Sequence, residues 1–222
     1  MKYFFVCFLL LILLVSVNAG DITLSAGINN NSFFKVSNDD FVETEYTDKI
    51  GFSFGIGIEG IKVYLLNTSY VLKYVQYGGD IYTHEYVVSH SFATNAETKK
   101  SIITLGIYPV NIKIFSHRLC VTAGFESNTL IFDKTTGTKS GVLYPVPESE
   151  FTLSLEENNI EINKRIIYGI CGSAGYEIFI NEKFKIRPRY LFYYGLTTDF
   201  INIEAETKSL RHNFEIVLIK SF

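Results

Sequence analysis

The last ten residues, Asn213-Phe-Glu-Ile-Val-Leu-Ile-Lys-Ser-Phe222, decide the fold. Side chains alternate between the two faces of an extended strand, so four apolar residues of this stretch share one face, and Glu215 and Ser221 lie on the other. A strand with one apolar face and a terminal aromatic residue is typical of the closing strand of a membrane β-barrel, whose outer face meets lipid. We expect the apolar residues of this face to act as the barrel's assembly signal. They are Phe214, Ile216, Leu218 and Phe222.

The N-terminus predicts export. Lys2 precedes an apolar run over residues 3–17, and the small residues Val17 and Ala19 stand at positions −3 and −1 of a cut before Gly20. This pattern is typical of a cleaved secretory signal peptide, predicted here as residues 1–19. A transmembrane helix is the alternative, but the run is shorter than the roughly 17–25 residues that a bilayer span needs. The rest of the chain, residues 20–222, is then one domain.

Composition narrows the class of protein further. The chain is 47% hydrophobic and 15% aromatic. No segment after the signal peptide is apolar enough to span a membrane as a helix, so these residues are spread over short strands. The predicted mature chain has 19 basic and 23 acidic residues, a net charge of −4, which argues against a nucleic-acid partner. Two cysteines remain, Cys120 and Cys171, and we expect both to be free, buried thiols.

Alternating segments recur along the chain and predict an all-β, eight-stranded, antiparallel up-and-down barrel. The clearest is Ile50–Glu59, where Phe and Ile occupy one face and mostly Gly and Ser the other, as suits a narrow barrel. The eight predicted strands are Asp21–Asn29, Ile50–Glu59, Ile61–Tyr77, Ser101–Phe115, Arg118–Ile131, Arg165–Ile180, Lys183–Leu196 and Ser209–Phe222.

The connections between these segments alternate in length. Tight connections are predicted at Gly60, Ser116-His117 and Asn181-Glu182, and long ones over 30–49, 78–100, 132–164 and 198–208. Short periplasmic turns and long extracellular loops are the rhythm of a transmembrane barrel, so we place the chain in a bacterial outer membrane. The long connections hold 17 of the 23 acidic residues, which predicts acidic extracellular loops.

Charged residues that remain within the strands lie opposite the aromatic residues. The interior of an eight-stranded barrel is about wide enough for side chains to fill, and buried charges must be paired. We therefore predict an ion network that plugs the lumen. Its predicted members are Glu59, Lys113, Glu126, Glu177, Lys185, Arg187, Arg189 and Glu215.

Three stretches resemble one known family. They are Gly51–Glu59, Gly169–Glu177 and Lys185-Ile-Arg-Pro-Arg-Tyr-Leu-Phe-Tyr-Tyr-Gly-Leu196. With the final strand they are similar to the small outer-membrane β-barrel domain family, the PorT-like barrels, over residues 20–222. The chain departs from the family at Ile107, where an acid often stands two residues before the proline, and at Lys220, where an apolar residue is usual. The resemblance implies fold and location more than function.

Few residues indicate chemistry. His84, Ser89 and His90 could serve a lipid-modifying enzyme at the outer rim, but no motif fixes a nucleophile beside a base, so no catalytic residue is predicted. Clustered acids over 148–161 lack the spacing of a calcium loop, so no metal site is predicted. We also predict no cofactor and no enzyme activity.

The favoured function is a barrel that anchors its loops for structural, adhesive or partner-binding roles. Its expected partners are outer-membrane lipid, lipopolysaccharide, the barrel-assembly machinery and an extracellular protein. Two alternatives remain open, the lipid-modifying enzyme and a secreted soluble barrel that binds a small apolar ligand. The last requires the aromatic face of Ile50–Glu59 to point inward.

Overall fold

The computed structural model describes residues 20–35, 42–63, 66–87, 90–115, 118–143, 151–158, 166–197 and 207–222, and this part of the chain consists of strands and turns. The predicted signal peptide, residues 1–19, lies outside it. The strands are β1 (Asp21–Lys35), β2 (Val42–Val63), β3 (Leu66–Val87), β4 (His90–Ile114), β5 (Leu119–Leu143), β6 (Phe151–Asn158), β7 (Ile166–Tyr176), β8 (Ile178–Phe179), β9 (Phe184–Gly195) and β10 (Thr207–Lys220).

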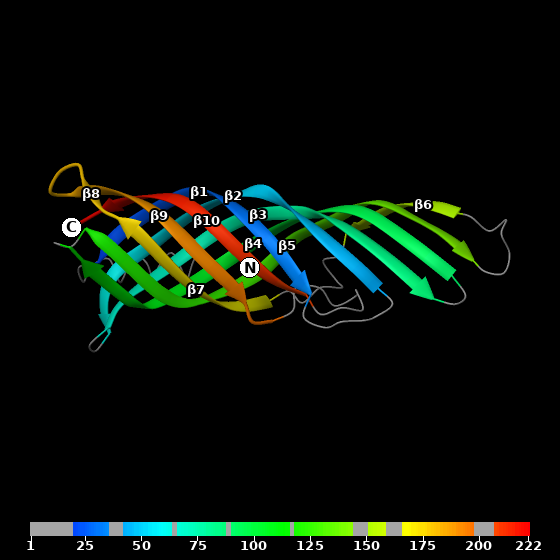
Figure 1. The fold of residues 1–222 in the computed structure, drawn as a ribbon. Helices are drawn as coiled ribbons and strands as arrows, with labels where there is room; N and C mark the ends of the chain where they lie inside the picture. The colour runs from blue at the N-terminus through cyan, green and yellow to red at the C-terminus, as the bar shows by residue number, and fades with distance from the viewer. Residues whose placement is uncertain are drawn as a thin grey trace.

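Eight strands close into a ring by antiparallel pairing. The hydrogen-bonded order is β10-β1-β2-β3-β4-β5-β7-β9, and β9 pairs with β10 to complete it (Figure 1). At the closure Ile22 lies opposite Lys220, so the start of β1 and the end of β10 lie side by side. The predicted eight-stranded, up-and-down, antiparallel barrel is therefore confirmed.

Four strands extend far beyond the barrel wall. β2 and β3 have 22 residues each, and β4 and β5 have 25. A transmembrane strand needs roughly 9–11 residues, and 22 residues at about 3.3 Å each span roughly 70 Å. The far ends of these four strands, together with β6, form a sheet that projects past β1, β7, β9 and β10, on the right of Figure 1. We call this part the projecting sheet.

The structure corrects three of the predicted long connections. Of residues 30–49, β1 contains 30–35 and β2 contains 42–49. Residues 78–100 were predicted as a long loop, but β3 and β4 run in register through nearly all of it, from Tyr77 opposite Lys100 to Val87 opposite His90. Residues 132–164 contain the end of β5 and all of β6. These stretches pair although they lack an apolar face, because their strands continue a ladder that the barrel has already nucleated.

Gly60 is also not the predicted turn. Strand β2 continues through it to Val63, and its pairing with β3 shifts register between Ile58 and Ile61. Gly60 has a φ of 82°, a conformation that favours glycine and marks a β-bulge. The turn near Asn181 is confirmed, since its Oδ1 accepts hydrogen bonds from the backbone N–H groups of Lys183 and Phe184.

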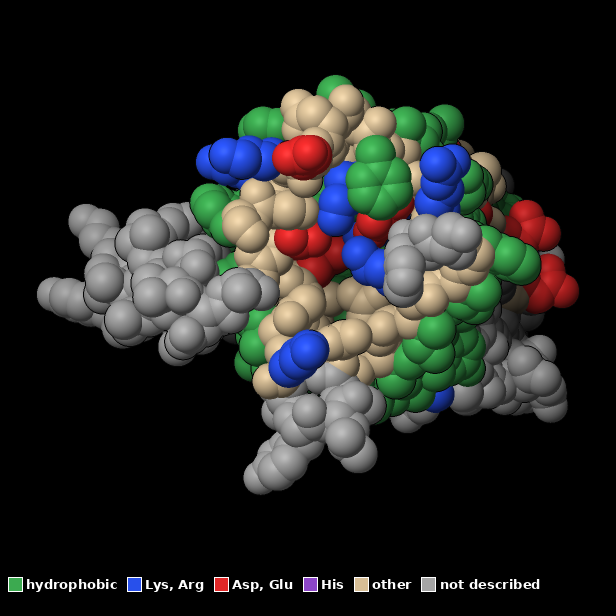
Figure 2. All heavy atoms as spheres, turned by 90° about the vertical axis from the view of Figure 1, so that its left-hand side faces the viewer, with side chains coloured by type: hydrophobic (Ala, Val, Ile, Leu, Met, Phe, Trp, Pro, Cys, Tyr) green, Lys and Arg blue, Asp and Glu red, His purple; other side chains and the backbone are tan. Residues whose placement is uncertain are grey.

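The two faces of the barrel wall differ as alternation predicts. Phe52 and Phe54 point outward, with exposed fractions of 41% and 56%, whereas Ser53 between them is buried. Figure 2 views the end of the barrel on the left of Figure 1 and shows acidic and basic side chains gathered in the central hollow, with hydrophobic side chains on the outer wall. The short connections from β2 to β3, from β4 to β5 and from β8 to β9 lie at this end, whereas the short connection from β3 to β4 lies at the opposite end. The predicted turn at Ser116-His117 lies outside the described residues. Among the described residues, no helix is long and apolar enough to cross a membrane.

Candidate functional site

The lumen holds charged side chains in layers. The first layer, the mouth cluster, lies at the end shown in Figure 2. Arg187 on β9 donates to both carboxylate oxygens of Glu59, at 2.9 and 2.8 Å, and also bonds Glu177. Lys113 Nζ lies 2.9 Å from the Glu177 carboxylate. Glu177 and Arg187 come together because β7 and β8 pair with β9 in one continuous register.

The second layer, the middle cluster, lies deeper in the lumen. Glu215 on β10 accepts hydrogen bonds from Lys73 at 2.9 Å and from the Nε and Nη2 of Arg189 at 3.2 and 2.5 Å. Glu126 on β5 accepts from Arg211 at 2.5 Å. Lys73 Nζ also lies 3.9 Å from Glu126 and links the two carboxylates. All five side chains are almost fully buried.

A tyrosine beside a bulge completes the middle cluster. Tyr108 continues the alternation of buried residues on β4 that includes Thr104 and Gly106. Its hydroxyl donates to Glu126 at 2.7 Å. The β4–β5 pairing then shifts register between Ile107 and Val110, around Pro109, because proline cannot donate to a ladder.

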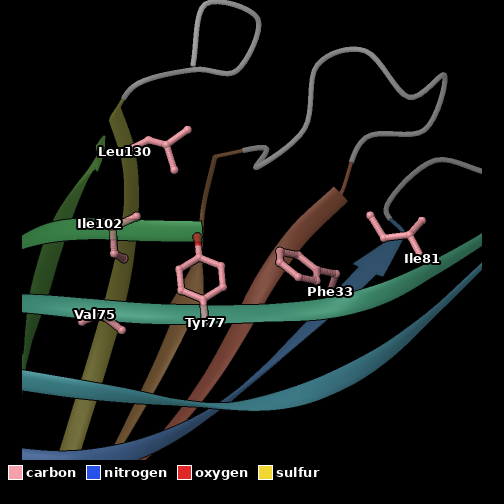
Figure 3. Packing of buried hydrophobic residues seen from close by; sticks show 6 residues of the cluster. All are labelled: Phe33, Val75, Tyr77, Ile81, Ile102 and Leu130. Atoms are coloured by element: carbon pink, nitrogen blue, oxygen red, sulfur yellow. The ribbon is translucent and has the colours of Figure 1, made fainter. Parts of the chain in front are cut away.

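An apolar layer covers the middle cluster on the side of the projecting sheet. Figure 3 shows its side chains directed toward one another from β1, β3, β4 and β5. The buried pair Lys100 and Asp133, 3.4 Å apart, lies at the same height, since Tyr77 is the register partner of Lys100. The apolar layer consists of Phe33, Val75, Tyr77, Ile81, Ile102 and Leu130.

The predicted lumen residues divide among these layers. The mouth cluster takes Glu59, Lys113, Glu177 and Arg187, and the middle cluster takes Glu126, Arg189 and Glu215. Lys185 lies apart from both: its Nζ is 3.6 Å from Asp21 and lies over the ring of Phe179. Lys185 lies on the inner face of β9, but it stands near the end of the strand, so its side chain lies at the rim of the barrel.

Sequence reasoning missed Lys73, Arg211 and Tyr108. Arg211 has the same parity as Glu215 on the last strand, so the alternation could have found it. Lys73 is the one charged residue in an apolar alternation on β3. Tyr108 has the same parity on β4 as the buried residues Thr104 and Gly106. Alternation therefore carried a usable signal for all three residues.

A pocket of about 350 Å³ opens at the mouth cluster. It is lined by Asp21, Glu59, Gly60, Asn67, Asn111 and Lys113. Nearby, the buried thiol of Cys120 donates to Asn111 Oδ1 at 3.2 Å. Cys120 and Cys171 are both free and buried, as predicted.

The residues of the predicted assembly signal point outward. Phe214, Ile216, Leu218 and Phe222 have exposed fractions of 60%, 56%, 39% and 70%. Lys220 lies with its Nζ 4.8 Å from the centroid of the Phe222 ring. The end of the chain therefore presents an apolar strip with one lysine folded over its terminal aromatic residue.

Charged residues mark the outer surface where the projecting sheet leaves the barrel. Lys49 Nζ lies 2.6 Å from Asp80 and 3.1 Å from Glu97, and Lys99 lies 3.3 Å from Glu97. The hydrogen bond to Asp80 raises the pKa of Lys49. The hydrogen bond from Lys49 lowers the pKa of Glu97. Lys49 directly precedes Ile50, where the apolar outer wall begins.

The residues considered for catalysis lie on the projecting sheet. His84 Nε2 is 3.1 Å from Ser91 Oγ, beside a pocket of about 270 Å³, and it packs against the Tyr82 ring. Ser89 lies outside the described residues, and His90 is described only as part of β4. Of the three residues considered for catalysis, only His84 has a described side chain.

The acidic run over 148–161 is only partly described. Glu156 and Glu157 belong to β6, while Glu148, Glu150 and Glu161 lie outside the described residues. Within the part of the chain that the structure describes, no group of three or more His, Cys, Asp or Glu side chains could hold a metal ion.

Fold and outer wall together define a class, the small transmembrane β-barrel of the outer-membrane type. Comparison adds the following likenesses. Ail, the attachment invasion locus protein of Yersinia pestis, is 11% identical over 90% of this chain and 98% of its own, with a TM-score of 0.41. OprG from Pseudomonas aeruginosa is 9% identical over 92% of this chain and 97% of its own, with a TM-score of 0.44. No protein-family model and no curated protein sequence matches the chain.

A third likeness corrects a prediction. The outer-membrane protease OmpT from Escherichia coli is 8% identical over 92% of this chain and 97% of its own, with a TM-score of 0.37. The prediction that this chain is not an enzyme was wrong as an inference from barrel form, because barrels of this form include a protease. Barrel form alone gives no ground for excluding catalysis.

Proposed function

We propose that the chain is an outer-membrane barrel with a closed lumen, which anchors the projecting sheet as a surface for a partner. One observation carries the proposal: a ring with an apolar outer wall continues into a large polar sheet, through an uninterrupted β3–β4 ladder and through β2–β3 and β4–β5 ladders that each have a register shift at the junction. An apolar wall stabilises the barrel in hydrocarbon. The polar sheet then lies in water, where its edges and faces are accessible.

Closure of the lumen is supported by its packing. The mouth cluster joins Arg187 to two carboxylates, and the middle cluster joins residues from β3, β5, β9 and β10 across the interior. The apolar layer lies above them. Water-filled channels have polar interiors that side chains do not fill, whereas this interior is crossed by direct side-chain contacts.

A partner surface is supported by the free edges of the projecting sheet. Among the described residues, β1 pairs with β2 from Asp21 to Asn30, so the backbone of residues 42–49 pairs with β3 alone. The Asn30 and Ser32 side chains of β1 still donate to Asp48 on this edge. On the other side β6 pairs with β5 over Phe151–Asn158. Unpaired strand edges are templates for an added strand from another chain. We propose an extracellular protein as that partner.

The outward aromatic face also bears on the alternatives. Phe52 and Phe54 are exposed and Ile56 is partly exposed, while Ile58 is packed at the barrel end. A soluble barrel with an apolar ligand in its lumen requires the opposite orientation. Membrane lipid and lipopolysaccharide are the proposed contacts of this wall, and the PorT-like barrels remain the proposed family. We propose that the barrel-assembly machinery binds the apolar strip at the end of the last strand.

Cell fractionation and gel migration test the location. We expect the protein in detergent-extracted outer membranes, with a compact band that shifts after boiling. Added protease should cleave the projecting sheet on intact cells and leave the barrel. A protein recovered from the periplasm without detergent would refute the proposal.

Bilayer recordings test the closed lumen. The purified protein, inserted in a planar bilayer, should give no steady single-channel steps. A matched variant that removes the middle cluster, Lys73→Ala with Glu126→Ala, controls for insertion, since it should give measurable leak if it inserts. Regular steps from the unaltered protein would show an open lumen.

A further inference from the structure

The charges of the middle cluster do not balance. Lys73, Arg189 and Arg211 are three cations, and Glu126 and Glu215 are two carboxylates. Tyr108 adds no charge, because its hydroxyl donates to Glu126. By contrast, the mouth cluster has two cations and two carboxylates, and Lys100 pairs with Asp133. Among the described lumen residues, one positive charge is therefore left over in the middle cluster.

Hydrogen-bond donors without partners lie on one side of this cluster. Arg211 Nε is buried and makes no hydrogen bond, and the same holds for Nδ2 of Asn31 and of Asn213. Two acceptors, the Oδ1 atoms of Asn213 and Asn29, are also buried without a hydrogen bond. Asn31 is the direct register partner of Arg211 across β1 and β10, and Asn213 follows two positions along on the same inner face. The exposed fractions of the three side chains are 1%, 2% and 0% for Asn31, Arg211 and Asn213.

We propose that the lumen binds a small monovalent anion, of the halide class, between Arg211, Asn31 and Asn213. A buried polar group without a hydrogen bond is costly, and a buried unpaired charge is more so. One anion would neutralise the surplus charge and accept from all three donors. This site goes beyond the proposed anchoring role and does not depend on it.

The neighbouring side chains limit the size and sign of the ligand. Asn29, opposite Asn213, donates its Nδ2 to the Gln76 carbonyl at 3.1 Å and directs its Oδ1 over Gly51. The ring of Tyr193 lies 4.5 Å from Arg211 Cζ and covers one face of the guanidinium. Phe33, two positions beyond Asn31, belongs to the apolar layer. Because the three donors are fully buried between these side chains, the proposal admits only a small anion, and a cation would add to the surplus charge.

Halide-dependent stability is the first test. The purified protein in detergent should unfold at a higher temperature in sodium chloride or bromide than in sodium gluconate of equal ionic strength, because a ligand that binds only the folded state stabilises it. Gluconate serves as an anion too large for the site. Equal unfolding temperatures in the three salts would overturn the proposal.

The variant Asn31→Asp supplies the missing charge from the chain itself. We expect it to unfold in gluconate at about the temperature of the unaltered protein in chloride, and to lose the halide response. Asn111→Asp makes the same change at the balanced mouth cluster and should keep the response. An equal response in both variants would assign it to a general salt effect and overturn the site.

Bromide diffraction gives a readout that needs no variant. Crystals of the unaltered protein grown with bromide should show an anomalous peak in contact with Arg211 Nε. Bromide peaks confined to the protein surface, with none in the lumen, would overturn the proposal even if Asn31→Asp fails to fold.

Discussion

Glu215 joins two cations of the middle cluster. It is the carboxylate to which both Lys73 and Arg189 bond, and its exposed fraction is 3%. Removing one partner of a buried ion pair leaves an uncompensated charge, which typically costs about 3–5 kcal/mol. Glu215→Gln should therefore lower the free energy of unfolding by that amount, measured by urea titration in detergent.

The matched control for this prediction is an exposed carboxylate. Glu97 pairs with Lys49 and Lys99 on the outer surface, where such pairs contribute about 0–1 kcal/mol. Glu97→Gln should thus be nearly neutral. If both variants lose the same free energy of unfolding, the middle cluster does not stabilise the barrel as its geometry implies.

Glycines allow close approach at a few wall positions, and Gly51 is the sharpest case. A Cβ placed there would lie 1.9 Å from the Gln76 carbonyl oxygen and 2.8 Å from Asn29 Oδ1. Gly51→Ala should therefore lower the free energy of unfolding by about 1–3 kcal/mol, the usual cost of overpacking. Gly172→Ala is the control, because its Cβ would meet only the Thr122 carbonyl oxygen, at 3.6 Å. Equal losses in the two variants would contradict the steric argument.

Single residues were predictable where alternation alone decides their face. Seven of the eight predicted lumen residues lie in the mouth or middle cluster, and Lys185 is the exception at the rim. Pairing partners were not predictable, because they depend on register. Glu126 and Arg211 are 85 positions apart in the sequence, and only barrel closure brings them together.

At the scale of elements, the sequence predicted the barrel wall and, of the projecting sheet, only the strand β6, from the alternation of Phe151, Leu153 and Leu155. Segments such as Ile50–Glu59 alternate strongly because lipid and lumen demand different side chains. The strand ends over 78–100 face water on their outer surface, so the alternation fades and a loop was inferred. Their strand structure comes from continuity with the wall, a tertiary effect that local pattern does not carry.

The contact of Lys49 with Glu97 ties β2 to β4 across β3, and it should depend on pH. The hydrogen bond from Lys49 lowers the pKa of the Glu97 carboxyl. The contact therefore stabilises the folded state above the usual pKa of 4.5, and this stabilisation is lost as the pH falls below that value. The Lys49 pKa is raised, so loss on the alkaline side begins only above 10.5. A double-mutant cycle with Lys49→Met and Glu97→Gln should give about 0.2–1 kcal/mol at pH 7.

The same cycle at pH 3.5 should give a smaller coupling energy than at pH 7, and high salt at pH 7 should reduce it too, because exposed charges are screened. A coupling energy that persists unchanged at pH 3.5 would mean that the two side chains interact by packing and not by charge.

At the scale of the whole molecule, the barrel wall and the projecting sheet share the strands β2 to β5. We nevertheless expect the wall to stay folded when the far end of the projecting sheet is removed. The wall holds the lumen clusters, which join β3, β5, β9 and β10, while the tip of the β3–β4 hairpin contacts only its neighbours in the sheet. A variant that replaces residues 83–94 with Asn-Gly should close between Tyr82 and Asn95, since these are register partners and Asn-Gly favours a tight hairpin turn. The shortened barrel should keep its heat-modifiable band and lose partner binding. A variant that no longer inserts would show that the projecting sheet is needed to fold the wall.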